Sequence, residues 1–572
     1  MKALPRLLLA MALMTAVFVV TNRMFPPVLP EPAVEPPPET PTGGAPEGEA
    51  IDFGQEMGGV AEEADPPSEV GLPEALVRDE EIVTVETPLM RVVFSSRGPA
   101  VRSVELLEYE SLASSGGGPV QLVPHGIETL LAGTWRVGSG SDELDLTRLS
   151  HSVSPADGLR LTGPGESATL TFRYEHPSQP FASELRYTFT SDSYIVGVEG
   201  RLPARARAAI FVDLGVGPAV NELREADDRA MMAFSAKHVS EGVHSRPFGR
   251  VKEPEAVTGP LSWAAVKSKY FVKVILAGGG DEGEATLAGL WAEPILGIGR
   301  AAVRVAMPID ADGSYRYRAY LGPIDRDRLS AVGDDLQEVN PVGWAFFRPI
   351  IKPFVAVALW AMRMLHDHLG LTYGWVLIAI GVLVRVVLWP LNQKAMRSQL
   401  KNMAAAPLLE EIKQKYGKDP QRMQQETLKL YREQGINPLA GCVPLLIPWP
   451  MLLALFFVFQ NTIQLRGQSF LWLQDLSAPD PLYVLPVFMA ASLFVVQRIS
   501  MKSMATVNPQ MKMMMYVLPI VLLFVFWRFA SGLNLYYAAF NVATIPQQIL
   551  IARERRRAQA GGVVPVPGPK KG

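Results

Sequence analysis

The side chains that usually perform catalysis form no familiar pattern in this chain of 572 residues. The sequence lacks the GxxxxGK[ST] loop that binds phosphates, the GxSxG turn of serine hydrolases and the HExxH helix of zinc proteases. Its one cysteine, Cys442, excludes an intrachain disulfide, and His366 and His368 lack the i, i+4 spacing of two ligands on one helix face. We therefore expect no enzymatic activity, no cofactor and no metal site.

The most informative ionisable residue is Arg385, the only charged residue in the apolar segment LTYGWVLIAIGVLVRVVLWP. A guanidinium inside a membrane span costs about 2.5–3.5 kcal/mol on insertion scales, so it should face a partner or a wet cavity. The other apolar segments contain no acidic residue that would pair with it. We favour a hydrated groove; the alternative is that Arg385 extends about 7–8 Å along the helix to the membrane surface near Pro390.

A polar stripe in the last apolar segment favours the groove. Its members, Tyr537, Asn541, Thr544 and Gln548, are spaced 4, 3 and 4 residues apart and therefore share one helix face. With Arg385 as a neighbour, this face would form a polar wall that holds water. The alternative is that the stripe supplies hydrogen bonds between packed helices.

Apolar helices must position these residues, and the composition of the chain predicts such helices. Hydrophobic residues make up 48% of the chain and the mean hydropathy is +0.14, which is too apolar for a wholly soluble protein. The net charge of −3 arises from charges segregated along the sequence, which gives no support for a global basic surface for nucleic acid.

The first half of the chain reads as an anchor, a linker and a β domain. Residues 7–20 form an apolar run after Lys2 and Arg6, either a cleaved signal peptide or an uncleaved anchor, and we favour the anchor. The Pro-, Gly- and Glu-rich stretch that follows has too few apolar residues to fold. From about residue 80, short β-rich stretches separated by turn residues predict an all-β domain, a large sandwich.

A cytoplasmic helical hairpin is expected between the second and third spans. Two helices, Gln393–Tyr416 and Gln421–Gln434, are predicted on either side of the turn GKDP. The first carries an approximately helical apolar stripe, and a proline within it would bend the helix. The hairpin residues that we single out are Met396, Leu400, Met403, Pro407, Leu408 and Ile412.

The basic residues determine the predicted orientation. They are concentrated in 391–438, 498–512 and the tail after 552, whereas the alternate loops hold only Arg466 and Arg528. By the positive-inside rule the three basic segments are cytoplasmic, and the β domain lies outside.

The predicted domains follow from these patterns. They are an N-terminal transmembrane anchor (1–22), a linker (23–79), a periplasmic β domain (80–340), an interfacial amphipathic helix (341–370), transmembrane helix 2 (371–390), the cytoplasmic hairpin (391–438), transmembrane helices 3 (439–460), 4 (482–497), 5 (513–531) and 6 (532–552), and a basic cytoplasmic tail (553–572).

Four runs in the second half, VRVVLWPLNQKA, INPLAGCVPLLIP, LWLQDLSAPDPLYVLP and SGLNLYYAAFNVATIPQQ, closely resemble the YidC/Oxa/Alb family of membrane protein insertases. The resemblance covers about 344–552, and the outer domain with YLGPIDRD near its end is similar to the periplasmic domain of the Gram-negative members. It implies a multi-domain fold: an α-helical polytopic membrane core of six transmembrane helices, five of them forming the insertase core, with an all-β supersandwich-like periplasmic domain and a cytoplasmic helical hairpin.

The resemblance also implies a function and site residues. The chain would insert nascent inner-membrane proteins and help them fold, alone or with the Sec translocon, through a hydrophilic groove open to cytoplasm and lipid. Arg385 matches the arginine of the family's groove, and Tyr537 matches a groove-lining tyrosine. Two positions depart from relatives: Gly381 stands where a hydroxyl residue can occur, and Pro448 where glutamine can occur, so this groove would be less polar.

The implied partners are nascent membrane proteins, the Sec translocon, the lipid bilayer and, through the basic hairpin and tail, the ribosome, with no specific nucleic-acid sequence. The implied location is the bacterial inner membrane, with both termini cytoplasmic. Two other functions stay open. A small-anion channel or transporter would use Arg385 as its binding site, but no internal repeats or paired discontinuous helices support it. A carbohydrate-acting β domain would follow from the family's likeness to sugar-mutarotase folds, which by itself does not supply function.

Overall fold

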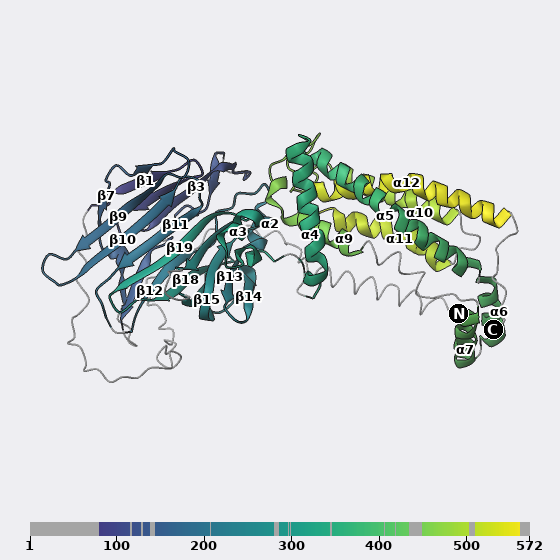
Figure 1. The fold of residues 1–572 in the computed structure, drawn as a ribbon, viewed down its shortest axis with the longest axis horizontal. Coiled ribbons are helices and arrows are strands. Elements are labelled where there is room, and N and C mark those ends of the chain that lie inside the picture. Colours follow the sequence, from purple (N-terminus) through teal and green to yellow (C-terminus); the bar gives the residue numbers. More distant parts are fainter. Residues whose placement is uncertain are drawn as a thin grey trace, which may run out of the picture. The chain divides into compact units, whose positions relative to one another are not determined.

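The computed structural model consists of two compact units, one up to Val339 and one from Asn340 onward (Figure 1). The described ranges are 79–114, 117–126, 130–137, 143–205, 207–278, 285–295, 297, 299–341, 343, 346–404, 406–417, 419–433, 449–502 and 509–560. The predicted anchor 1–22, residues 23–78 of the linker, Pro448 and the tail beyond 560 lie outside them. Side chains of some helical residues, Met396, Leu400, Met403 and Pro407 among them, are also outside the description.

The smaller sheet of the β domain has the strand order β4-β3-β2-β1-β8. Its strands are β1 (Ile82–Glu86), β2 (Met90–Ser95), β3 (Val101–Glu110), β4 (Pro119–Gln121) and β8 (Leu159–Arg160). Neighbours pair antiparallel except β1 and β8, which are parallel.

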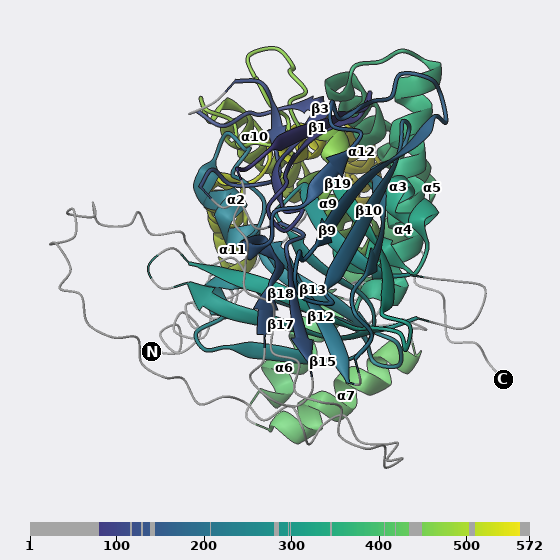
Figure 2. The same cartoon turned by 90° about the vertical axis from the view of Figure 1, so that its left-hand side faces the viewer.

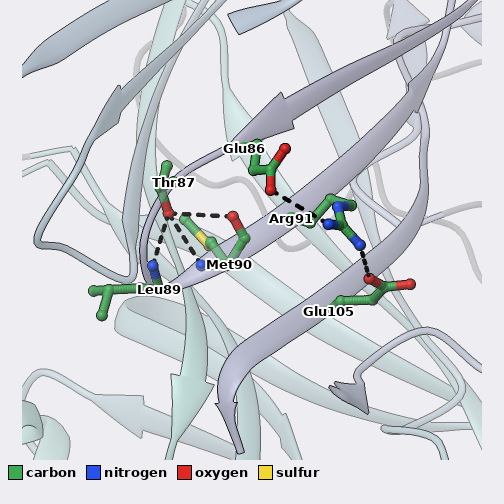
Figure 3. A network of polar contacts seen from close by, with 6 residues as sticks. All are labelled: Glu86, Thr87, Leu89, Met90, Arg91 and Glu105. Atoms are coloured by element: carbon green, nitrogen blue, oxygen red, sulfur yellow. Dashed lines mark hydrogen bonds and ion pairs between the residues drawn. The ribbon is translucent and has the colours of Figure 1, made fainter. Parts of the chain in front are cut away.

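Polar contacts fix the β1–β2 turn and the register of this sheet (Figure 3). The Thr87 hydroxyl oxygen accepts hydrogen bonds from the backbone N–H groups of Leu89, at 3.2 Å, and Met90, at 3.0 Å. Arg91 bridges Glu86 at 3.3 Å and Glu105 at 2.9 Å, one on each neighbouring strand. Because partly exposed ion pairs contribute only about 0–1 kcal/mol each, these pairs specify the alignment more than the stability.

The larger sheet has 14 strands and the path β6-β5-β12-β18-β17-β15-β16-β19-β11-β10-β9-β7, with β13 and β14 attached to β15. In that order the strands are β6 (Glu143–Asp145), β5 (Gly133–Val137), β12 (Ala208–Gly215), β18 (Arg300–Pro308), β17 (Leu287–Ile295), β15 (Glu255–Lys267), β16 (Phe271–Ala277), β19 (Ser314–Pro323), β11 (Ile195–Arg201), β10 (Ala182–Thr190), β9 (Ser167–Glu175), β7 (Ser152–Ser154), β13 (Ala233–His238) and β14 (Gly242–Pro247). Two short helices, α2 (Glu225–Met231) and α3 (Arg326–Val332), accompany it.

The two sheets pack face to face, which confirms the predicted sandwich. Strand β10 alternates buried and exposed residues, as a strand does when one face is covered. The ring of Phe94 on β2 lies 5.6 Å from Phe172, 4.8 Å from Tyr187 and 6.1 Å from Phe189 on the larger sheet. Figures 1 and 2 both show β1 and β3 beside β10 and β19. Aromatic pairs at these separations are worth about 0.5–1.5 kcal/mol beyond their burial.

The second unit is helical. Its helices are α4 (Arg348–Arg363), followed by a π-helical turn (Met364–His368), α5 (Tyr373–Ala404), α6 (Ala406–Tyr416), α7 (Pro420–Glu433), α9 (Trp449–Asn461), α10 (Val484–Lys502), α11 (Pro509–Phe526) and α12 (Ser531–Ala560). Helix α4 packs mainly on α9 and also contacts α5 (Figure 1). It buries Ile351 and Val355 but exposes Val357 and Trp360, as a helix in the membrane interface would.

Two helices of the described chain are long and apolar enough to cross a membrane, Tyr373–Gln393 and Val484–Met501. Met451–Asn461 and Tyr516–Phe526 are shorter apolar helices, so the count of six spans stays a prediction. Helix α5 continues past the span end predicted at residue 390 as far as Ala404, and α6 begins at Ala406. The structure therefore joins the predicted transmembrane helix 2 to the first part of the predicted hairpin helix Gln393–Tyr416, which it divides between α5 and α6. The residues after Pro390 include Gln, Lys, Ala, Met and Leu, which favour helix, so no break separates the span from the hairpin.

Candidate functional site

Helices α5 and α12 approach each other closely at Gly381. A methyl group at this position would lie 3.0 Å from the Tyr536 carbonyl oxygen and 3.2 Å from Ala539 Cβ. Small residues permit such close helix contacts in membrane proteins. The structure therefore places Gly381, predicted as a groove-lining residue, in the contact between two helices.

Arg385 lies one turn after Gly381 and is only 7% exposed. Its Nη2 donates a hydrogen bond to Oε1 of Gln547 on α12, and its guanidinium carbon lies 5.7 Å from the centre of the Phe540 ring. Its buried Nε has no hydrogen-bond partner within the described residues. No carboxylate among the described residues forms an ion pair with Arg385, and this cation contacts an amide and an aromatic face.

The Arg385 side chain extends toward the C-terminal ends of both helices. Gly381 lies beside residues 536–540, whereas the partner of Arg385 is Gln547, which also donates to the Trp389 carbonyl oxygen at 3.3 Å. The guanidinium thus reaches about one helical turn beyond its own Cα. This is the direction that the membrane-surface alternative predicts, but the side chain ends on a buried amide.

Sequence reasoning missed Gln547 and selected its neighbour Gln548. The two follow Thr544 by three and four positions, and both spacings keep a residue near one helix face. In the structure Gln547 is fully buried against α5, and Gln548 is only partly buried. The sequence therefore indicated a glutamine at this position of the helix face, but its spacing fits Gln547 and Gln548 equally well.

The other members of the stripe contact different neighbours. Asn541 Nδ2 donates to Ser492 Oγ at 3.1 Å on α10. The Tyr537 hydroxyl lies 3.5 Å from the Leu452 carbonyl oxygen on α9, and Thr544 donates to the carbonyl of Phe540 in its own helix at 2.8 Å. For Asn541 the described contact is a hydrogen bond between helices, as the alternative interpretation of the stripe proposed.

These contacts show that α12 carries buried polar side chains on two of its sides. Its Gln547 side meets α5, while its Asn541 side meets α10. Ser492, Asn541, Thr544 and Gln547 are all buried. The arrangement holds one cation and several neutral hydrogen-bonding groups between three apolar helices.

The predicted hairpin contains two helices that pack on each other, α6 and α7. The carboxylate of Asp419 caps α7 by accepting from the Arg422 N–H at 3.1 Å. Leu408 and Ile412 on α6 are partly buried. The described residues contain no cluster of three or more His, Cys, Asp or Glu side chains that would hold a metal ion.

Two buried ionisable groups of the β domain, Lys273 and His151, contact backbone carbonyl oxygens. Lys273 Nζ, in a residue that is 1% exposed, donates to the Gly217 carbonyl oxygen at 3.2 Å, and burial lowers the pKa of Lys273 to about 7. Burial likewise lowers the pKa of His151 to about 4; its Nδ1 lies 3.1 Å from the Leu149 carbonyl oxygen. These groups belong to the packed core.

One hollow at the rim of the β domain is lined by Glu175, His176, Arg201 and Asp312, among others. Hydrogen bonds from the Ser314 side chain and backbone lower the pKa of Asp312 to about 2, and Arg201 pairs with it at 3.3 Å. A carboxylate with so low a pKa stays ionised and is unsuited to the general-acid role in glycoside chemistry. Asp312 therefore does not supply that acid in this hollow.

Comparisons with known proteins agree with this architecture. Residues 82–357 match the family described as YidC periplasmic domain, and residues 364–558 match the family described as 60Kd inner membrane protein. The membrane protein insertase YidC of Chlorobaculum parvum is 30% identical over 521 residues, which cover 86% of each chain. That of Syntrophus aciditrophicus is 27% identical over 499 residues, 86% of this chain and 88% of the relative.

Among solved structures, an active YidC insertase crystal structure with the first transmembrane domain resolved is 19% identical. The match covers 84% of this chain and 94% of that chain, with a TM-score of 0.32. The two family matches and the extent of the sequence identity to the Chlorobaculum parvum protein show that this chain belongs to the YidC family of membrane protein insertases.

Proposed function

We propose that this chain inserts nascent membrane proteins into the lipid bilayer and that the buried Arg385–Gln547 pair receives their acidic translocated segments. The observation that carries the proposal is a cation held between apolar helices by a neutral amide, with no carboxylate recorded beside it among the described residues. Apolar packing alone does not require such a costly group, and ionisable residues inside membranes are functional by default.

Because the hydrogen-bond partner of Arg385 is a neutral amide, a carboxylate can replace that partner. Hydrogen bonds between a guanidinium and a carboxylate are roughly twice as strong as neutral ones. A client carboxylate that enters the predicted groove would therefore displace Gln547 from Arg385. The membrane potential, positive outside, then favours outward movement of each negative charge by about 2.3 kcal/mol per 100 mV.

The outer face of α5, on the side of the helix away from the Arg385–Gln547 contact, is apolar and exposed. Leu383 is 50% exposed, Val386 59% and Val387 62%, within one or two residues of Arg385. In the proposed path an apolar client helix slides along this face into lipid, while its polar end reaches the Arg385 side chain near the C-terminal ends of α5 and α12. Partition of about 20 apolar residues supplies the main driving force.

The orientation that suits this function has both termini and the α6–α7 hairpin in the cytoplasm and the β domain in the periplasm of a bacterial inner membrane. The basic residues of 391–438 and of the tail support it. The same charges suit contact with the ribosome, and cooperation with the Sec translocon is part of the proposal.

Site-specific photo-crosslinking to a stalled nascent membrane protein tests the function. Probes at Leu383, Val387 and Tyr537 should crosslink the client. A probe at Phe524 on α11, which is 70% exposed, is the matched control and should crosslink weakly. Equal crosslinking at all four positions, or none at α5 and α12, would contradict the proposed path.

A further inference from the structure

Large apolar side chains are exposed where the helices of the second unit end. They come from the loop between α9 and α10 and from the turn between α11 and α12. Leu471 is 75% exposed and Leu482 64%, and the rings of Trp472, Tyr483 and Trp527 are also exposed. We name these five residues the apolar cap: Leu471, Trp472, Leu482, Tyr483 and Trp527.

The loop that carries the cap is held in one conformation by a buried carboxylate. Asp480, 1% exposed, accepts hydrogen bonds from Trp472 Nε1 at 3.1 Å, from the Leu482 N–H at 3.0 Å and from the Leu485 N–H at 2.7 Å. Leu471 and Tyr483 have φ values of 53° and 57°, a left-handed conformation that costs side-chain-bearing residues about 1–3 kcal/mol. The outward position of the apolar side chains is therefore built into the loop.

The Asp480 contact also prepares Trp472 for apolar surroundings. Transfer of an indole N–H from water into a membrane without a hydrogen-bond partner has a free-energy cost of several kcal/mol. Here the partner is supplied from within the protein, at 3.1 Å. The Trp472 ring can thus lie in the membrane while its N–H stays hydrogen-bonded to Asp480.

The cap continues the exposed apolar faces of two helices. On α10 the exposed residues Val484, Val487 and Phe488 follow directly from Tyr483 at helical spacing. On α11 the exposed residues Ile520 and Phe524 lead to Trp527. The rings of Tyr483 and Trp527 stack at 4.1 Å, so the two faces meet in the cap.

We propose that the apolar cap lies in the bilayer at the interface between headgroups and acyl chains, with lipid as its partner. The cap adjoins the outer face of Val484–Met501, a helix long and apolar enough to span a membrane, and that face must meet lipid in an insertase of this family. Aromatic residues concentrate at this depth in membrane proteins. Exposed Arg528, beside Trp527, is placed for contact with lipid phosphate.

Contact between the apolar cap and lipid has a structural consequence. Helix α10 packs on α12, which carries Gln547, and α12 packs on α5, which carries Arg385. An anchored cap fixes the depth of α10 and α11 and, through these contacts, the depth of the Arg385–Gln547 pair. The inference about the cap rests on family membership and stands apart from the role proposed for Arg385.

Spin-label accessibility in proteoliposomes tests the proposal on the full chain. Single cysteines replace Leu471 or Leu482 in a Cys442→Ser background, because Cys442 is the one native cysteine. Collisions of the label with oxygen, which concentrates in lipid, are compared with collisions with the water-soluble nickel chelate NiEDDA. Phe488→Cys serves as the lipid reference, and Val239→Cys, an exposed apolar residue of the β domain, as the water reference.

Labels at Leu471 and Leu482 should show an oxygen-to-nickel ratio several times that at Val239 and approaching that at Phe488. A ratio equal to that at Val239 places the cap in water and overturns the proposal. Low collision rates with both reagents place it against protein, a second copy included, and also overturn it. If one leucine variant fails to reconstitute, the other reports on the same surface, since Trp472 and Leu482 share the Asp480 carboxylate.

Discussion

The β domain and the helical unit both bury cations, but they hold them in different ways. Lys273 in the β domain donates to a backbone carbonyl, that of Gly217, which the fold of the strands fixes. Arg385 in the helical unit donates to the side chain of Gln547 on another helix. Helices satisfy their own backbone groups, so a buried cation between helices depends on side chains.

Lys273 therefore has a fixed partner and a structural role, whereas the partner of Arg385 can be exchanged. The Gly217 carbonyl, two residues after β12, moves only if the backbone moves, whereas a glutamine amide needs only to rotate. We therefore expect changes at Lys273 to alter the stability of the β domain and changes at Arg385 or Gln547 to alter insertion.

Varying the charge at Arg385 tests most directly whether this cation is exchangeable. Insertion of clients with acidic translocated tails should fall in the order Arg385→Lys, Arg385→Ala, Arg385→Glu. An attraction at 4 Å is worth about 1 kcal/mol in water but about 4 at an effective dielectric of 20, so the loss should reach roughly tenfold or more in a partly dehydrated site. The measurement is the insertion rate of one client with neutral and acidic tails at equal expression. Equal impairment of both tails by Arg385→Ala would make Arg385 structural.

The glutamine pair provides a matched test of exchangeability. Gln547→Glu should hold Arg385 in an ion pair and slow insertion of acidic tails several-fold, because a client carboxylate must then displace another carboxylate. Gln548→Glu, the same change one residue away, should have little effect. Gln547→Leu should instead destabilise the helical unit by about 1–3 kcal/mol, since it removes the recorded hydrogen-bond partner of a buried cation. Thermal unfolding in detergent measures that loss, and equal effects of the two glutamate variants would refute the assignment of Gln547.

The β domain should respond through pH-dependent stability. Because burial lowers the folded-state pKa of Lys273 to about 7 from 10.5, the unfolded state binds the extra proton between these values. Stability should therefore rise with pH across this window, by about 1.4 kcal/mol per unit from this residue between pH 8 and 9, and fall as pH drops toward 7. Lys273→Met should remove that slope, which hydrogen exchange of β16 in the full chain can measure. An unchanged slope would show that Lys273 does not titrate in this range.

The smallest expected effect is that of removing the β domain. Deletion of residues 80–339, with the first anchor and α4 retained, should leave insertion largely intact, because Arg385, Gln547 and the hairpin all lie in the second unit. Complete loss of insertion by a truncated protein that folds correctly in the membrane would contradict this division of labour.

The broad organisation of this protein follows from patterns in its sequence. Alternating stretches such as that of β10 predicted a sandwich because a strand buries every second side chain, and the structure has it. The apolar segment 371–390 predicted α5 because a membrane-spanning helix needs about 20 apolar residues, whereas the shorter predicted span 482–497 overlaps a longer apolar helix, Val484–Met501. The isolated charge of Arg385 identified the candidate site, since a lone cation among apolar residues is conspicuous without any knowledge of its neighbours.

Which groups meet at Arg385 depends on how the helices pack. Helical periodicity places Asn541, Thr544 and either glutamine near one face but does not say which helix that face contacts. Close packing at Gly381 sets the rotation of α12 against α5, and that rotation turns Gln547 toward Arg385 and Asn541 toward Ser492. Contacts between distant segments depend on the packing of several helices at once, and the period of a single helix carries no record of it.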